Sequence, residues 1–269
     1  MGPAAVHGKF VDFAHRLADA AGAVIRPYFR SPIAVDDKGT GQAGYDPVTI
    51  ADQEAEAVIR QLILKEHPDH GILGEEHGAQ AGTSEWTWVI DPIDGTRAFI
   101  TGFPVWGTLI ALNDGKRPVL GVMDQPVLRE RYIGDGKNAE AIVAGERRPL
   151  RTRDCHALAA AVVTTTHPTG YFSLAEQQAF RSIADRARMS RFGGDCYAYA
   201  MLAMGLVDAV IEASLKPYDI QALIPIVEGA GGRVTDWKGG DAQHGGRIVA
   251  AGDARVHAEI LETLSALPD

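Results

Sequence analysis

Apolar residues form two kinds of pattern along the chain, and each pattern predicts one type of element. From residue 5 to residue 29 they return every three or four positions, which is typical of an amphipathic helix that packs one face on a core. Short runs rich in Val, Ile and Trp instead predict buried strands. The three- to four-residue spacing also predicts helices at residues 52–65, 174–187, 193–204, 219–229 and 253–264.

The order of these elements divides the chain into two halves of different texture. Four apolar runs between residues 105 and 144 are separated by turn signals such as Asp-Gly, and they predict an antiparallel meander. Beyond residue 151, strands alternate with helices, which indicates two αβ layers that share a core. Because no repeat, linker or low-complexity segment interrupts the sequence, we expect one domain over residues 1–269. Its N-terminal α+β half spans 1–150 and its C-terminal α/β half spans 151–269.

Composition and charge narrow the class of protein. The chain of 269 residues is 46% hydrophobic, which is enough for a large core, and its formal net charge is −9. Because nucleic acids and anionic membranes attract a positive face, this charge argues against both as partners. Cys155 and Cys196 form no Cys-x-x-Cys motif, so we predict neither a disulfide framework nor a thiolate metal site. No run approaches the ~20 apolar residues of a membrane span, and we expect a cytoplasmic protein.

Candidate chemistry is concentrated at the end of one apolar run. Residues 86–91 suit a central strand, whereas Pro92 removes a backbone donor and Gly95 permits a tight turn. We therefore expect strand pairing to stop here and to leave Asp91 and Asp94 side by side. Two adjacent carboxylates repel unless a cation lies between them, and hard divalent cations prefer oxygen ligands. The alternative is an ordinary solvated turn.

Further acids stand where other predicted elements begin or end. Asp46 lies just before Thr49 and Asp52, a pair whose spacing predicts a helix-capping box rather than catalysis. Glu75 follows a short apolar run, and Asp219 begins a predicted helix. Sequence spacing alone does not establish that these acids meet in space.

Three motifs resemble the signatures of the inositol monophosphatase family of magnesium-dependent, lithium-sensitive phosphatases. They are Gly74-Glu75-Glu76, the stretch from Trp88 to Thr96, and Tyr218-Asp219 followed by Glu228-Gly-Ala-Gly231-Gly232. The resemblance covers essentially the whole chain, with the motifs in the same order. The one departure is Tyr218, where the family usually has Trp; both are large aromatics. The resemblance implies an α+β fold of the sugar-phosphatase type, a layered αβαβα sandwich whose halves meet at the metals. It also implies a homodimer.

Carried over to this sequence, the resemblance implies a set of metal ligands. Glu75, Asp91 and the backbone carbonyl of Ile93 would hold one Mg²⁺. Asp91, Asp94 and Asp219 would hold a second ion, and a third, weaker ion would depend on Glu75. Manganese is expected to substitute for magnesium, and lithium is expected to inhibit.

The resemblance also implies which residues act on water and phosphate. Asp46 and Thr96 would orient the attacking water, and the amides of Gly95 and Thr96 would hold phosphate oxygens. Lys38 lies at the edge of a glycine-rich segment that matches Gly-x-Gly-x-x-Gly but runs into a Pro turn instead of a helix. We interpret that segment as a loop and Lys38 as a candidate phosphate contact.

The substrate is indicated by two acids in the C-terminal half. Glu212 resembles the family glutamate that contacts the alcohol part of the substrate. Asp195 stands where inositol-specific members usually have small residues, and an ammonium group would gain a charge-assisted hydrogen bond from it. Histidinol phosphate carries such a group, and residues 97–108 also resemble the histidinol-phosphatase branch. The alternative is that Asp195 only caps the following helix and that the enzyme is an inositol monophosphatase or a broad sugar phosphatase.

A different class of function also fits the same residues. A binding module or metal-dependent regulator could keep the fold and lose turnover. Every ligand that the resemblance implies is present, which favours an enzyme. Phosphate release from small phosphomonoesters, with and without Mg²⁺, separates the two classes.

Overall fold

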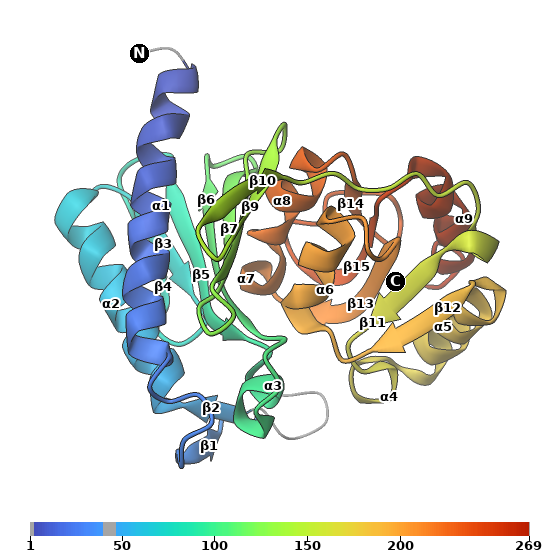
Figure 1. Ribbon diagram of the computed structural model, residues 1–269, viewed down its shortest axis with the longest axis horizontal. Coiled ribbons are helices and arrows are strands. Elements are labelled where there is room, and N and C mark those ends of the chain that lie inside the picture. The colour runs from blue at the N-terminus through green and yellow to red at the C-terminus, as the bar shows by residue number, and fades with distance from the viewer. Residues whose placement is uncertain (1–2, 40–46, 269) are drawn as a thin grey trace.

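The computed structural model describes residues 3–39 and 47–268, in which two sheets with helices on their faces dominate (Figure 1). In these residues the N-terminal half forms an eight-stranded sheet and the C-terminal half a five-stranded sheet. A short antiparallel pair, β1 (Val35–Asp37) and β2 (Pro47–Thr49), lies apart from both sheets.

The larger sheet contains β3 (Gly71–Gly74), β4 (Gly78–Gln80), β5 (Thr87–Asp94), β6 (Gly107–Asn113), β7 (Pro118–Gln125), β8 (Glu130–Gly134), β9 (Ala139–Val143) and β10 (Glu146–Pro149). Their order is β10-β9-β8-β7-β6-β5-β3-β4. The neighbours β5 to β10 form the predicted antiparallel meander and its extensions. In contrast, β3 and β5 are parallel. Their carboxyl ends are therefore side by side, and the residues that follow each strand meet at one edge of the sheet.

The smaller sheet contains β11 (Val162–Thr165), β12 (Met189–Phe192), β13 (Ala209–Leu215), β14 (Arg233–Asp236) and β15 (Gly246–Ala251), in the order β12-β11-β13-β15-β14. It is a mixed sheet. The strand β11 is parallel to β12 and β13, whereas β15 is antiparallel to β13 and β14.

Helices cover both faces of both sheets (Figure 1). The outer layer on the larger sheet consists of α1 (Pro3–Ile25) and α2 (Ile50–Glu66). The middle layer consists of α6 (Asp195–Ala203), α7 (Pro217–Ile220) and α8 (Leu223–Gly229), and the other outer layer of α5 (Leu174–Arg186) and α9 (Ala254–Leu264). The short helices are α3 (Thr96–Thr101), η1 (Leu158–Ala160) and α4 (Pro168–Tyr171). This arrangement confirms the αβαβα sandwich.

Strand residues alternate between the two faces of each sheet, and both faces are buried. In β5, Trp88 and Ile90 pack with α1 and α2, whereas Val89 packs with the middle helices. In β13, Val210 packs in the middle layer and Ile211 packs with α5 and α9. The sheets thus separate three apolar cores, and the middle one contains residues of both halves of the chain.

Several boundaries differ from the sequence predictions. The helix expected over residues 219–229 is two helices, α7 and α8. Strand pairing does not stop at Asp91: β5 pairs again at Asp94, after a register shift that leaves Pro92 and Ile93 without paired partners in β6. The bulge replaces a clean end because Pro92 has no N–H to donate. The exposed strand β10 pairs with β9 and lies beyond the last of the four predicted runs.

Candidate metal centre and active site

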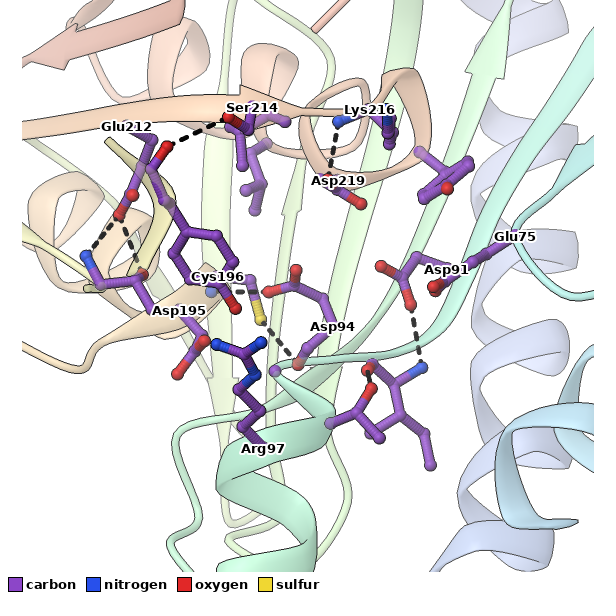
Figure 2. A pocket seen from close by; sticks show the side chains of 18 of the residues that line it. Glu75, Asp91, Asp94, Arg97, Asp195, Cys196, Glu212, Ser214, Lys216 and Asp219 are labelled. Atoms are coloured by element: carbon purple, nitrogen blue, oxygen red, sulfur yellow. Dashed lines mark hydrogen bonds between the residues drawn. The ribbon is translucent and has the colours of Figure 1, made fainter. Parts of the chain in front are cut away.

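A cavity of about 430 Å³ opens where the larger sheet, the smaller sheet and the middle helices meet. Its volume suits a small ligand. The end of β5, the start of α3 and the start of α6 form one side, and the end of β13 and α7 form another (Figure 2). The acidic residues that line it are Glu75, Asp91, Asp94, Asp195, Glu212 and Asp219.

Three of these acids form a compact cluster. Asp91, Asp94 and Asp219 each offer a carboxylate oxygen, and these oxygens lie within 4.8 Å of one another (Figure 2). Burial raises the pKa of Asp94 to about 6. Burial, followed by the charges of neighbouring acids, raises the pKa of Asp91 and of Asp219 well above the ordinary value. A cation bound here would relieve this repulsion, and a set of oxygen donors fits a hard divalent ion.

Local backbone structure explains how the cluster forms. The bulge in β5 separates Asp91 from Asp94, and the amide of Ile93 donates to the Asp91 Oδ1 at 3.1 Å. Asp219 lies in the first turn of α7, where its Oδ2 accepts from the amide of Lys216 at 2.7 Å. Because α7 packs against β5, the helix brings Asp219 to the strand end.

Glu75 lies next to this cluster, as the parallel pairing of β3 and β5 requires. It follows β3, and its amide donates to the carbonyl of Ile90 at 3.2 Å. Its side chain lies next to Asp91 (Figure 2), and its negative charge adds to burial in raising the pKa of Asp91. The Lys38 Nζ lies 3.0 Å from a Glu75 oxygen and 2.6 Å from a Glu76 oxygen. Lys38 thus pairs with Glu75, the predicted metal ligand, and its expected contact with phosphate stays a prediction.

The segment after β5 forms the floor of the cavity. Gly95 has a left-handed backbone (φ 87°) and caps α3. The Thr96 hydroxyl donates to the carbonyl of Ile93 at 3.0 Å. A carbonyl oxygen has two lone pairs, so this hydrogen bond leaves Ile93 one free for a metal. Asp46 and the glycine-rich segment after Gly39 lie outside the described residues.

Asp195 packs directly against this floor. A side chain at Gly95 would place its Cβ 3.0 Å from the Asp195 Cβ, so the close approach requires glycine. Asp195 itself adopts a left-handed backbone (φ 43°), which is uncommon for a residue other than glycine. Burial, then the charge of Asp94, raises the Asp195 pKa to about 7, whereas Arg97 lowers it.

The helix-cap alternative for Asp195 is wrong. The N-cap residue of α6 is Gly194, which has no side chain, and the amide of Cys196 in the first turn donates to the Asp94 Oδ2 at 2.7 Å instead of to Asp195. Asp94, a member of the acidic cluster, therefore accepts an amide at the start of this helix, because the β5 bulge lies against it. The carboxylate of Asp195 is directed to the cavity, beside Arg97 (Figure 2).

Glu212 lies on the opposite wall, in β13. One carboxylate oxygen accepts from the amide of Thr166 at 2.8 Å and from its hydroxyl at 2.9 Å. The other accepts from the Thr165 hydroxyl at 3.3 Å. Burial raises the pKa of Glu212 to about 8. The side chain is held by the end of β11 while it lines the cavity, which is compatible with the predicted contact to the alcohol.

Sequence reasoning did not single out three other residues of the cavity wall. Arg97 packs its guanidinium on the ring of Tyr171, 5.1 Å from the centroid. Tyr199, on α6, is buried beside Glu212 and Asp94. Arg97 directly follows the central motif and could have been noted from that position. The two tyrosines carry no local signal, because only the tertiary fold brings α4 and α6 to the site.

The αβαβα sandwich and the cluster of carboxylate oxygens where its sheets meet are typical of metal-dependent phosphatases, and the comparison with known proteins agrees with this class. The chain belongs to the inositol monophosphatase family, whose model matches residues 8–268, and it is a phosphatase of that family. This confirms the family resemblance that the three motifs carried.

Particular relatives are similar over nearly the whole chain. The chloroplastic bifunctional phosphatase IMPL2 of Arabidopsis thaliana is 44% identical over 95% of this chain and 75% of the relative. The histidinol-phosphatase of Mycobacterium tuberculosis is 34% identical over 93% of this chain and 95% of the relative. A solved inositol monophosphatase from Zymomonas mobilis is 39% identical, with a TM-score of 0.83 over 96% of this chain and 98% of that chain. In the described part of the chain, none of the helices is long and apolar enough to cross a membrane.

Proposed function

We propose that the protein hydrolyses small phosphomonoesters with Mg²⁺ and prefers histidinol phosphate. The observation that carries the phosphatase mechanism is the convergence of the Asp91, Asp94 and Asp219 oxygens within 4.8 Å. Because the donors are all oxygen, hard Mg²⁺ is the expected ion, with Mn²⁺ as a substitute. The family membership of the chain supports this assignment.

The proposed ligands are those that the family resemblance implies, and the positions of Asp91, Asp94 and Asp219 are compatible with them. Asp91, Asp94 and Asp219 would hold one ion, and Glu75, Asp91 and the Ile93 carbonyl another. A third, weaker ion would depend on Glu75. Bound Mg²⁺ would lower the pKa of a coordinated water and offset charge that develops on the phosphoryl and leaving oxygens.

The protein groups around these ligands position the reactants. The Thr96 hydroxyl lies at the cavity floor beside the Ile93 carbonyl, where, together with Asp46, it would orient the attacking water. The amides of Gly95 and Thr96 would donate to phosphate oxygens at the start of α3. In this proposal no side chain acts as a covalent nucleophile.

Asp195 supports histidinol phosphate as the substrate. Its carboxylate lines the cavity, it does not cap α6, and it lies against Gly95, close to the proposed phosphate position. An ammonium group near Asp195 would gain a charge-assisted hydrogen bond, whereas a polyol hydroxyl would gain less. Arg97 beside Asp195 competes for the same carboxylate, so the substrate amine must displace or share that contact.

The relatives support two substrate classes. The similarity to the histidinol-phosphatase of Mycobacterium tuberculosis supports histidinol phosphate as the substrate of this chain. The Zymomonas mobilis inositol monophosphatase has a similar structure, which favours inositol phosphate or a broad range of sugar phosphates as the alternative. The name of the bifunctional plant phosphatase does not choose between them.

The test of this proposal compares two substrates in two proteins. We expect wild type to have a higher kcat/KM for histidinol phosphate than for inositol 1-phosphate. The substitution Asp195→Ala should lower this ratio by roughly 10-fold or more, because a hydrogen bond to a charged group contributes about 1.5–3 kcal/mol. A wild-type preference for inositol 1-phosphate, or an unchanged ratio in Asp195→Ala, would contradict the substrate and leave only the phosphatase.

We also propose that the protein is a homodimer in the cytoplasm. The dimer rests on the family resemblance. The location is supported by Cys155 and Cys196, which are free thiols, as expected in a reducing compartment. Light scattering after size-exclusion chromatography gives the mass; a monomer would contradict the dimer.

A further inference from the structure

A buried carboxylate outside the cavity, that of Glu56, contacts the backbone that follows Glu75. Glu56 is on α2 and its side chain is fully buried. Glu75, Glu76 and His77 form the turn between β3 and β4. The amide of Glu76 donates to the Glu56 Oε2 at 2.7 Å, and the amide of His77 donates to the Glu56 Oε1 at 3.1 Å. One carboxylate thus accepts from both residues that follow Glu75.

Arg60 completes this arrangement from the same helix. Its Nε donates to the Glu56 Oε1 at 2.7 Å, which supplies the buried carboxylate with a countercharge. Its Nη2 also donates to the carbonyl of Gly78, the first residue of β4. The pair therefore holds the turn at its amides and at its far carbonyl.

Gly74 makes this contact possible because it has no side chain. A side chain at Gly74, the last residue of β3, would place its Cβ 2.0 Å from the Glu56 Oε1. Glycine is needed there because the strand backbone packs directly on the carboxylate. The need for Gly74 comes from packing and not from an unusual backbone angle.

Glu75 is consequently fixed from two sides. Its own amide bonds to Ile90 in β5, and the next two amides bond to Glu56 in α2. Its side chain lines the cavity next to Asp91 (Figure 2). A ligand whose backbone is held in this way loses little conformational entropy when it binds a metal.

We propose that Glu56 is a positioning residue for the metal centre and sets metal affinity through the backbone of Glu75. The inference rests on the proposed function, in which Glu75 is a metal ligand. Glu56 touches neither substrate nor metal in this account.

The substitution Glu56→Gln tests the inference. Glutamine keeps the volume but turns one acceptor into a donor, which then faces the amide of Glu76 or of His77. We expect the dissociation constant for Mg²⁺, measured by calorimetry without substrate, to rise by about 10- to 100-fold. Glu56→Asp keeps the charge and should give a smaller rise, and it carries the test if Glu56→Gln does not fold.

Asp208→Asn is the matched control. Asp208 is also buried, and it also accepts from a backbone amide, that of Val162 at 2.7 Å, and from an arginine, Arg153. It is not among the residues that line the cavity, and it directly precedes β13. We expect a similar loss of thermal stability in Asp208→Asn and an unchanged affinity for Mg²⁺.

A double substitution separates positioning from general destabilisation. If Glu56 acts through Glu75, adding Glu56→Gln to Glu75→Gln should not weaken metal binding further. If the two substitutions reduce Mg²⁺ affinity additively in the double variant, the inference is overturned. It is also overturned if Glu75→Gln binds Mg²⁺ weakly while Glu56→Gln binds it with wild-type affinity. Wild-type affinity in Glu75→Gln would instead show that Glu75 is not a ligand, and the proposed metal set would fail together with the role of Glu56.

Discussion

At the scale of single residues, the closeness of Asp91 and Asp94 has a local cause in the β5 bulge, whereas the contact of Asp195 with Gly95 has a tertiary one. Pro92 lies in the bulge of β5 and Gly95 directly follows the strand, and together they explain why Asp91 and Asp94 lie close together there. The contact between Gly95 and Asp195 joins residues 100 positions apart, and no local pattern encodes it. The sequence raised a functional role for Asp195 and also a helix cap; only the structure excludes the cap, because Asp94 accepts the relevant amide.

The substitution Gly95→Ala tests the importance of that contact. Alanine would occupy a left-handed backbone and would press on Asp195, so we expect lower stability by about 1–3 kcal/mol and lower kcat/KM. Gly145→Ala is the control, because Gly145 has a similar φ of 91° but nothing within 4 Å of the added Cβ. Urea denaturation should show a smaller loss for Gly145→Ala. Equal losses, with activity intact in both variants, would contradict a tight Gly95–Asp195 contact.

At the scale of elements, hydrophobic periodicity found most helices and strands, and capping patterns found one boundary accurately. Thr49 and Asp52 form the predicted capping box at the start of α2. The division between α7 and α8 could not be predicted. It occurs at Gln221, whose side chain joins a buried amide network with Asn113 and Gln243 from other parts of the chain.

A second capping box provides a test away from the active site. Ser173 accepts from the amide of Glu176, and the Glu176 side chain accepts from the amide of Ser173. We expect Ser173→Ala to lower the free energy of unfolding by about 1 kcal/mol. Ser182→Ala, at an exposed position of the same helix, should change it by less than about 0.5 kcal/mol. Equal unfolding midpoints for Ser173→Ala and wild type in urea would contradict the cap.

At the scale of the whole molecule, the convergence of distant acids was beyond what spacing could show. Asp219 reaches Asp91 only because α7 packs on β5 across the middle core, and the family resemblance, not periodicity, implied this meeting. We propose that the two halves form one domain, since the middle core contains residues of both. Several carboxylates are buried close together in this structure, which lowers the stability of the folded state when they are ionised and no metal is bound.

The burial of these carboxylates predicts how the stability of the folded state depends on pH. Burial raises the pKa of Asp94, Asp195 and Glu212 to about 6, 7 and 8, above ordinary values of 3.8 for Asp and 4.5 for Glu. Between about pH 4 and pH 8 the folded state then binds more protons than the unfolded state, so stability without metal should fall as the pH rises. Mg²⁺ should raise the Tm more at pH 8 than at pH 5, because bound metal competes with protons. Thermal denaturation in EDTA and in Mg²⁺ measures both effects, and a Tm in EDTA that rises from pH 5 to pH 8 would contradict this account.

The central claim is that buried carboxylates at the end of β5 bind the Mg²⁺ on which hydrolysis depends. Phosphate release from histidinol phosphate, with Mg²⁺ and after EDTA dialysis, tests it most directly in wild type and Asp91→Asn. Asparagine removes the Asp91 charge at nearly constant volume, so circular dichroism should be unchanged while turnover falls by about 10³-fold or more. Wild type should lose turnover in EDTA and regain it when Mg²⁺ is restored. Sustained turnover in EDTA, or wild-type turnover in Asp91→Asn, would contradict the claim.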